Sequence, residues 1–118
     1  MTYDDNNVFA KILRGELPCK KIYEDDAALA FYTIEPKAKV HAVVAIKGSY
    51  VDYPDFLRHA GSEIIADFSR ACRKTAEALG LDKTGYRLVI NTGKDSGQTI
   101  PHLHAHVLGG EDLDKCGK

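Results

Sequence analysis

Apolar and polar positions follow two different rhythms along the chain, which predict helices and strands in separate stretches. Apolar residues recur at helical spacing over residues 7–14 and, for longer, over residues 62–79. An asparagine at position 6 or 7 can cap the first helix, and a glycine follows each helix and can end it. The pattern therefore predicts one short N-terminal helix and one long helix.

Shorter apolar stretches, bounded by polar residues and glycine, predict five strands. We expect them over residues 20–24, 28–32, 40–46, 86–91 and 102–108. Pro101 suits the start of the last strand, because proline lacks the N–H that a strand interior needs. Residues 50–56 contain Pro54 and three aromatic side chains, and we expect a turn there. Since the helices are segregated from an antiparallel sheet, the fold class is predicted to be α+β.

Length, charge and cysteine usage narrow the class of protein. The chain has 118 residues and a formal net charge of -1 at pH 7, so we expect one domain over residues 1–118. We expect neither nucleic acid nor membrane as a partner, because there is no basic excess and no apolar run of ~18 residues. The N-terminus is polar and acidic, unlike a signal peptide. An odd cysteine count without a C-x-x-C pair indicates reduced thiols in the cytoplasm (Cys19, Cys72 and Cys116).

The most informative stretch lies between Asn91 and Gly110, where three of the five histidines stand two residues apart. Successive side chains of a strand point to opposite faces, so His102, His104 and His106 would share one face. A helix would scatter the three imidazoles around its axis. The Gly-containing segment before them can offer backbone N–H groups beside the imidazole row. Three histidines in register favour a working site over a set of unrelated surface or core residues.

The order His-φ-His-φ-His-φ-φ, in which φ is an apolar residue, resembles the defining motif of the histidine triad family of nucleotide hydrolases and transferases. The flanks Gly97-Gln98-Thr99 and Leu108-Gly109-Gly110 are similar to the branch that hydrolyses nucleoside phosphoramidates. This resemblance covers nearly the whole chain. It implies a hydrolase that attacks the α-phosphate of purine nucleoside 5′-phosphoramidates or related nucleotidyl conjugates. It also implies a homodimer in which the long helix and the following strand meet their copies.

The resemblance assigns roles to five residues by their positions. His104 matches the nucleophile, which would form a nucleotidyl-histidine intermediate that water then hydrolyses. The backbone carbonyl of His102 would accept a hydrogen bond from the second ring nitrogen of His104 and fix its tautomer. His106 would contact the phosphate and the scissile atom, and His41 would support the triad from a neighbouring strand. Thr99 would help deliver a proton to the leaving group. Adjacent imidazoles will not all be cationic, because like charges lower each other's pKa.

Other positions of the resemblance outline a nucleotide pocket. We expect four residues to hold the α-phosphate and the nucleoside oxygens, namely Asn91, Gly97, Gln98 and Thr99. Those expected around the base are Phe9, Ile12, Phe31 and Ile34. Such an apolar wall would discriminate bases weakly. Thr33 stands where the phosphoramidase branch usually has an aspartate that binds the ribose hydroxyls. Charge-assisted hydrogen bonds are about twice as strong as neutral ones, so we expect weaker ribose binding.

Three other functions stay open from the sequence. The histidines could bind a divalent metal, but such a site usually adds a carboxylate, and none lies near the triad. Many relatives bind a structural zinc through cysteines in the stretch equivalent to residues 6–10, which has none here. We therefore expect no metal or other cofactor. The chain could instead be a nucleotide-binding interaction module with little turnover. The intact triad argues against this function, whereas Thr33 in place of the usual aspartate leaves it open. Within the enzymes, a dinucleoside polyphosphate hydrolase is the nearest rival.

Overall fold

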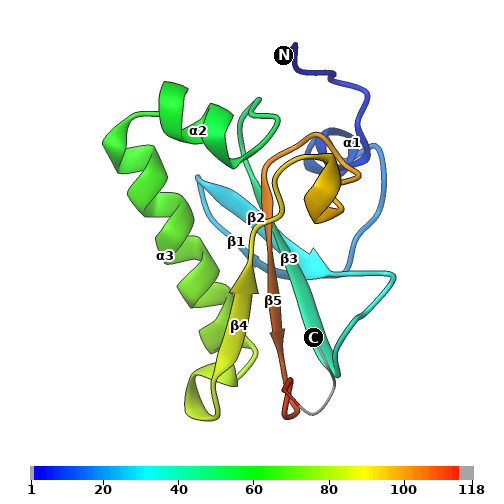
Figure 1. Ribbon diagram of the computed structural model, residues 1–118, viewed down its shortest axis with the longest axis vertical. Coiled ribbons are helices and arrows are strands. Elements are labelled where there is room, and N and C mark those ends of the chain that lie inside the picture. Colours follow the sequence, from blue (N-terminus) through cyan, green and yellow to red (C-terminus); the bar gives the residue numbers. More distant parts are fainter. Residues whose placement is uncertain (1, 115–118) are drawn as a thin grey trace.

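A five-stranded antiparallel sheet is the framework of the computed structural model, which describes residues 2–114 (Figure 1). The strands are β1 (Lys21–Glu24), β2 (Ala28–Tyr32), β3 (Val40–Ile46), β4 (Tyr86–Val89) and β5 (His104–Gly109). Their order across the sheet is β1-β2-β3-β5-β4, and every neighbouring pair is antiparallel. The helices are α1 (Val8–Leu13), α2 (Tyr53–His59) and α3 (Ser62–Ala78), with 3-10 turns at Leu81–Lys83 and Lys94–Ser96. The predicted α+β fold with five antiparallel strands is confirmed.

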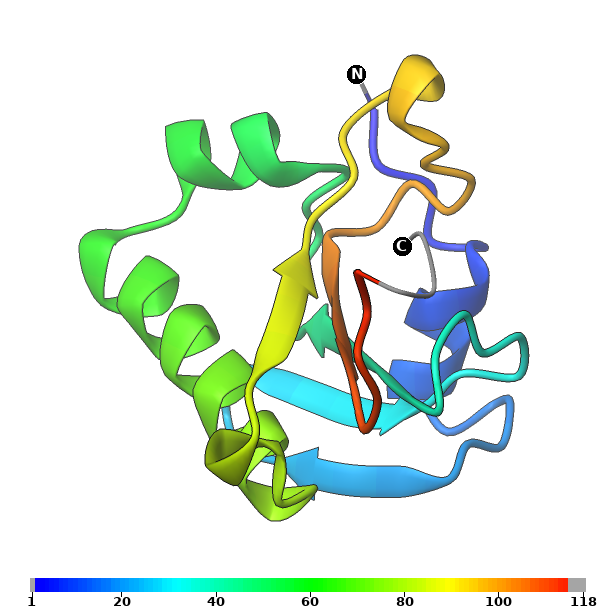
Figure 2. The same cartoon turned by 60° about the horizontal axis from the view of Figure 1, so that its bottom comes forward.

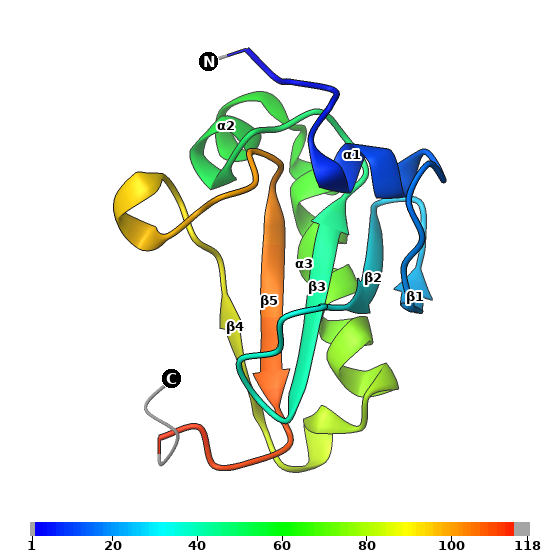
Figure 3. The ribbon, with the colours of Figure 1, turned by 90° about the vertical axis from the view of Figure 1, so that its right-hand side faces the viewer.

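One face of the sheet packs against α3 and forms the main core. Alternate strand residues on this face are fully buried, namely Ala28, Ala30, Ala42, Val44, Ile46, Ala105 and Val107. They meet a buried stripe of α3 that consists of Phe68, Ala71, Cys72 and Ala76. Figures 2 and 3 show α3 along this face and α1 beyond the opposite one. The predicted apolar face of α3 is therefore correct from Phe68 onward, whereas Ile64, one turn earlier, is 45 % exposed.

The opposite face of the sheet carries a smaller buried cluster. Leu29, Phe31, Val43 and Ala45 pack there with Phe9 of α1. The strand register explains why this face also carries histidines. Val43 pairs with Phe31 on one side and with His106 on the other, and cross-strand partners lie on the same face. Asn7 caps α1 by accepting a hydrogen bond from the N–H of Ala10 at 2.9 Å, which holds this helix over the histidine face.

Two predicted elements are wrong in ways that affect the site. Residues 50–56, expected to form a turn, run into α2, whose cap Asp52 accepts a hydrogen bond from the N–H of Asp55. Pro54 lies in the first turn of this helix, where N–H groups have no intrahelical partner, so it does not oppose the helix. The last strand begins at His104, not His102, because the His102 N–H bonds to the carbonyl of Ile100 instead of a neighbouring strand.

Several other boundaries shift by one or two residues, as helix and strand ends commonly do. β1 begins at Lys21 and β4 ends at Val89, each slightly inside the predicted range. Within residues 2–114, no helix combines the length and the apolar character needed to cross a bilayer. Cys116, and the part of the C-terminal tail after residue 114, lie outside the described residues.

Candidate active site

A hollow of about 1360 Å³ lies on the histidine face of the sheet, between α1, the loop after β2 and the loop before β5. One part of its wall is apolar and consists of Val8, Phe9, Ile12, Leu17, Phe31, Val43 and Ile100. The polar part includes Thr33, His41, Asn91, Gly97, Gln98, Thr99, His104 and His106. Ile34 also lines it. The structure thus brings every predicted site residue except His102 to this one pocket.

His104 is held in a single tautomer by the backbone. Its Nδ1 lies 2.7 Å from the carbonyl oxygen of His102, and a carbonyl can only accept, so Nδ1 carries the proton and donates it. Nε2 is left with a free lone pair in a ring that is 8 % exposed. Burial lowers the pKa of this imidazole and keeps it neutral at pH 7. The hydrogen bond implied by the histidine motif is therefore present, and it leaves a nitrogen suited to nucleophilic attack.

A second chain of hydrogen bonds fixes the tautomer of His106. The backbone N–H of Lys37 donates to Nδ1 of His41 at 2.9 Å, so the proton of the neutral His41 ring is on Nε2. That nitrogen lies 2.9 Å from Nδ1 of His106, which must accept. Neutral His106 therefore carries its proton on Nε2. Its ring centroid is 5.0 Å from that of His104, so the pocket contains an unprotonated nitrogen and an N–H donor side by side.

Burial is the main reason why these imidazoles stay neutral. The pKa of His102 and that of His106 are lowered to about 4, mainly by burial, with a smaller contribution from neighbouring histidines. Burial also lowers the pKa of His41, to which the charge of Lys37 adds. These lowered pKa values agree with the expectation that adjacent imidazoles would not all be cationic, although burial and not like charge is the larger cause. At pH 7 the cluster therefore offers lone pairs and N–H donors rather than fixed positive charge.

His102 lies beneath the pocket wall instead of forming part of it. Its side chain is 0 % exposed, and its Nε2 lies 2.8 Å from the carbonyl oxygen of Ile46, to which it donates. Its ring meets Phe9 edge to face at 6.2 Å, on the same side of the sheet as His104. The prediction that His102 lies on the same side of the sheet as His104 is thus correct. The prediction that His102 is part of the last strand is wrong, because the backbone bends at His102. His102 acts on the site through its backbone carbonyl, which accepts the hydrogen bond from His104.

Gln98 lines the pocket, and its side chain also shapes the loop before β5. Nε2 donates to the carbonyls of Val51 and Ile100 at 2.9 Å and 3.1 Å, and Oε1 accepts from the N–H of Gly93 at 2.9 Å. Both amide hydrogens are therefore used within the protein, and the expected substrate contact of Gln98 stays a prediction. Gly93 and Gly97 have φ of 79° and 88°, values that favour glycine. Together these residues fix a backbone loop at the pocket.

The loop after β2 positions two predicted residues differently. Thr33 lines the pocket, and its Oγ1 accepts a hydrogen bond from the N–H of Glu35 at 3.3 Å, which leaves its hydroxyl hydrogen to donate. Ile34 is 95 % exposed, so it lies at the rim and is not packed into an apolar wall as expected. Val43 and Ile100 supply apolar wall that sequence reasoning missed. Val43 could have been found, because it stands two residues after His41 on a strand and must share its face.

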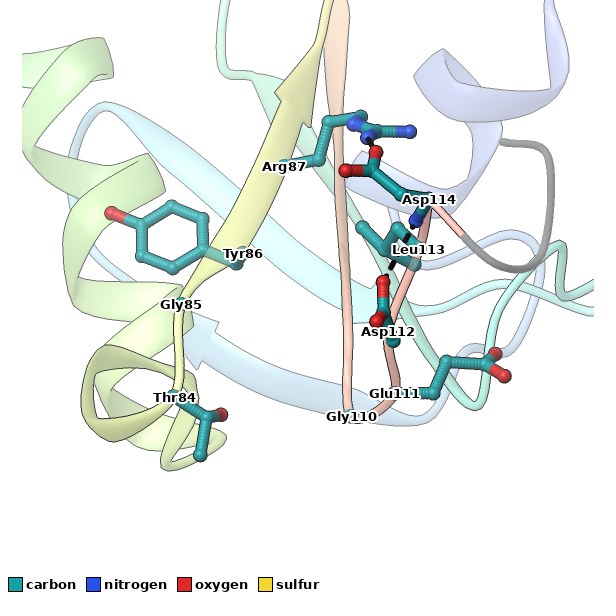
Figure 4. Close-up of a pocket in the computed structure, with 9 residues that line it drawn as sticks. All are labelled: Thr84, Gly85, Tyr86, Arg87, Gly110, Glu111, Asp112, Leu113 and Asp114. Atoms are coloured by element: carbon teal, nitrogen blue, oxygen red, sulfur yellow. Dashed lines mark hydrogen bonds and ion pairs between the residues drawn. The ribbon is translucent and has the colours of Figure 1, made fainter.

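A second hollow, of about 570 Å³, lies beside the start of β4 and the end of β5 (Figure 4). Its lining comes from residues 84–87 and 110–114 and contains three acidic side chains and no histidine. Arg87 Nη2 is paired with Asp114 Oδ1 at 3.0 Å. An acidic surface does not favour a phosphate, and we assign no site to it. Among residues 2–114, no group of three or more His, Cys, Asp or Glu side chains is arranged to hold a metal ion.

Known proteins resemble this chain over nearly its whole length. The family model of the HIT domain matches residues 14–113. An uncharacterized 13.2 kDa HIT-like protein of Azospirillum brasilense is 50 % identical over 112 residues, which are 95 % of this chain and 92 % of that protein. A HIT-like protein of Rickettsia prowazekii is 48 % identical over 111 residues, 94 % of this chain and 92 % of its own.

Solved structures agree with the sequence relatives. A histidine triad protein from Clostridium difficile superimposes with a TM-score of 0.85 at 37 % identity, over 95 % of this chain and 96 % of that one. A HIT family hydrolase from Legionella pneumophila gives a TM-score of 0.85 at 37 % identity, over 92 % and 96 % of the two chains. The domain match, the relatives and the fold agree with the histidine motif at the start of β5, and the chain belongs to the HIT family.

Proposed function

We propose that this protein is a nucleotide hydrolase of the nucleoside phosphoramidase type. It attacks the α-phosphate of purine nucleoside 5′-phosphoramidates or related nucleotidyl conjugates. The observation that carries the proposal is the pairing of an unprotonated His104 Nε2 with the N–H of His106 in one pocket. Similar solved structures from Legionella pneumophila and Clostridium thermocellum are described as HIT family hydrolases, which supports hydrolysis as the reaction class.

The reaction proceeds by two displacements at phosphorus. In the first, His104 Nε2 forms a bond to the α-phosphorus and the P–N bond to the leaving amine breaks, giving a nucleotidyl-His104 intermediate. The amine takes up a proton from water, relayed by the Thr99 hydroxyl, while the His106 N–H keeps its proton and donates a hydrogen bond to the phosphate. In the second, water attacks the same phosphorus and His104 leaves, which releases the nucleoside monophosphate. The proton lost by that water restores the one given to the amine, so the enzyme returns to its starting state.

The two parts of the pocket wall suit the two parts of such a substrate. Phe9 and Phe31 meet edge to face at 5.6 Å and form an apolar surface for the face of a purine. Asn91, Thr99 and the backbone at Gly97 are placed for the phosphate and sugar oxygens. The Thr33 hydroxyl can donate to a ribose oxygen, without the negative charge of the aspartate that is usual in this branch. The base is therefore held by contact area and the phosphate by hydrogen bonds.

A kinetic panel tests the proposal directly. The purified protein is assayed with a purine nucleoside 5′-phosphoramidate, a dinucleoside polyphosphate and a nucleoside 5′-phosphosulfate, before and after exhaustive chelation. We expect the highest kcat/KM with the phosphoramidate, no change on chelation and no stoichiometric zinc. A preference for the dinucleoside polyphosphate would reassign the substrate class. Activity that is lost on chelation and restored by one metal per chain would contradict the metal-independent mechanism. AMP binding without turnover of any substrate would indicate a binding module.

We also propose a homodimer formed along the edge of the sheet at β4. This strand pairs with β5 on one side, and on the other it leaves backbone groups available to a further strand. Tyr86 and Leu88 on this strand are 40 % and 47 % exposed. We expect a dimer by light scattering after size exclusion, and a monomer for Leu88→Lys, which places a charge in the interface. Leu57→Lys, at a residue 44 % exposed on α2, is the control and should stay dimeric. A wild-type monomer would contradict this.

The cysteines fit the cytoplasmic location that we propose. Among the described residues, Cys19 and Cys72 are free thiols, the first exposed and the second buried. Reducing compartments keep such thiols unpaired, whereas secreted proteins of this size often use disulfides. Burial raises the pKa of the Cys72 thiol to about 12, so this residue is inert core material and no candidate nucleophile.

A further inference from the structure

We propose that Tyr3 is a positioning residue for the nucleophile and acts on His104 through His102. Tyr3 Oη lies 2.6 Å from Nδ1 of His102, and the two rings meet edge to face with centroids 5.7 Å apart. Tyr3 is 99 positions away from His102 in sequence and precedes residues 14–113, the part that matches the HIT domain. The inference rests on the proposed function, because it takes His104 as the nucleophile.

The Tyr3 hydroxyl completes the set of hydrogen bonds around a fully buried ring. His102 donates from Nε2 to the Ile46 carbonyl, so its neutral ring has a lone pair on Nδ1 and needs a donor there. Tyr3 supplies that donor from its O–H. The carbonyl of the same residue receives the Nδ1 proton of His104 at 2.7 Å. The ring of His102 is thus anchored at both nitrogens, and its backbone holds the nucleophile in the reactive tautomer.

Tyr3 is itself held in place by the segment that caps α1. The carbonyl of Asp4, the next residue, accepts hydrogen bonds from the side chain of Asn7 at 2.8 Å and from its backbone N–H at 3.3 Å. The carbonyl of Asp5 accepts a bond from Arg14 Nη1 at 2.9 Å. α1 then places Phe9 against the ring of His104, edge to face at 4.7 Å. The N-terminal segment therefore contacts both His102 and His104.

The hydroxyl also disfavours a proton on His102. A donor that occupies Nδ1 stabilises the neutral ring, and the titratable side chains in contact with this ring are Tyr3 and His104. Attack on phosphorus places positive charge on the ring of His104. A protonated His102 beside it would oppose that charge. Tyr3 therefore supports the chemical step rather than substrate binding, since His102 lies beneath the pocket wall.

Tyr3→Phe tests this, because it removes the hydroxyl and keeps the ring. We expect kcat to fall about tenfold with KM and AMP affinity nearly unchanged. Without the donor, Nδ1 of His102 takes up a proton more readily and the pKa of this ring rises. The acidic limb of the kcat profile should therefore move to higher pH. In ¹⁵N NMR, the Nδ1 resonance of His102 should shift on loss of the Tyr3 hydrogen bond, whereas Nε2, which donates to the Ile46 carbonyl, should stay protonated. Tyr53→Phe, at a tyrosine 38 % exposed on α2, is the matched control and should change nothing.

The outcomes separate this inference from the proposed function. If the wild type forms a nucleotidyl adduct on His104 and Tyr3→Phe keeps wild-type kcat and pH profile, the role of Tyr3 is overturned. A fall in kcat without any change in the pH profile or in the Nδ1 resonance of His102 would indicate packing alone and would also overturn the role of Tyr3. If the wild type forms no adduct on His104, the proposed function fails first, whatever Tyr3→Phe does.

Discussion

Replacing His104 with asparagine should lower turnover of a nucleoside phosphoramidate by roughly 10³-fold or more while nucleotide binding persists. Asparagine keeps a polar group of similar reach but has no nitrogen lone pair that can attack phosphorus. The pocket walls and the loop held by Gln98 do not depend on the imidazole, so AMP should bind with nearly unchanged affinity. Steady-state kinetics and calorimetry measure the two effects separately.

Two further histidines provide the controls for this experiment. His59→Asn should have almost no effect, because His59 is exposed and hydrogen-bonds to Asp55 on α2, away from the triad. His106→Asn should be milder than His104→Asn, since Asn91 and Thr99, which also line the pocket, would still contact the phosphate in the proposed mechanism. Mass spectrometry after an acid-free quench of wild-type turnover should find the nucleotidyl group on His104. Near wild-type turnover by His104→Asn, or an adduct on another histidine, would refute the assignment.

Phe56→Ala should lower the free energy of unfolding by about 3–5 kcal/mol, the usual cost of removing a buried aromatic ring. Phe56 is 0 % exposed and meets Tyr50 and Phe68 edge to face, with ring centroids 5.0 Å and 5.5 Å away. Its loss leaves a cavity where α2 and α3 join. The damage should also reach the site, because the Tyr50 carbonyl accepts the N–H of Leu103, next to His102. Urea denaturation measures the change.

The neighbouring residue offers a matched control for that measurement. Leu57→Ala removes apolar surface from the same helix, but Leu57 is 44 % exposed, so we expect a change within about 0.5 kcal/mol. An equal loss for the two substitutions would show that burial of the Phe56 ring is not the source of the effect.

Periodicity alone was enough to place most of the site. The two-residue spacing of His104 and His106, and the apolar residues between them, determine which face of β5 meets α3 and which faces the pocket. Local pattern could not show where the ladder of β5 begins, because the bend at His102 depends on a bond to Ile100 and on the contact between Leu103 and Tyr50. The bond between Leu103 and Tyr50 is a tertiary contact without a sequence signature.

The roles of two side chains in the site could not be predicted from the sequence pattern for a similar reason. Gln98 has the polarity of a ligand-binding residue, and only the folded loop shows that its amide is used by Val51, Gly93 and Ile100. Tyr3 lies in a polar stretch without periodicity, and nothing in the sequence connects it to His102. Pairings between segments far apart in the chain are what single-sequence reasoning cannot supply.

Alternate residues of β5 face the pocket and the core, so the length of this strand is as constrained as its composition. The residues at 104 and 106 face the pocket, and those at 105 and 107 are 0 % exposed against α3. A one-residue insertion or deletion inside the strand would exchange these sets, moving imidazoles into the core and apolar groups into the pocket. Substitutions could erode the site gradually, but a single indel there would remove catalysis and stability together. Length variation is therefore best accommodated in the loops at the ends of the strand.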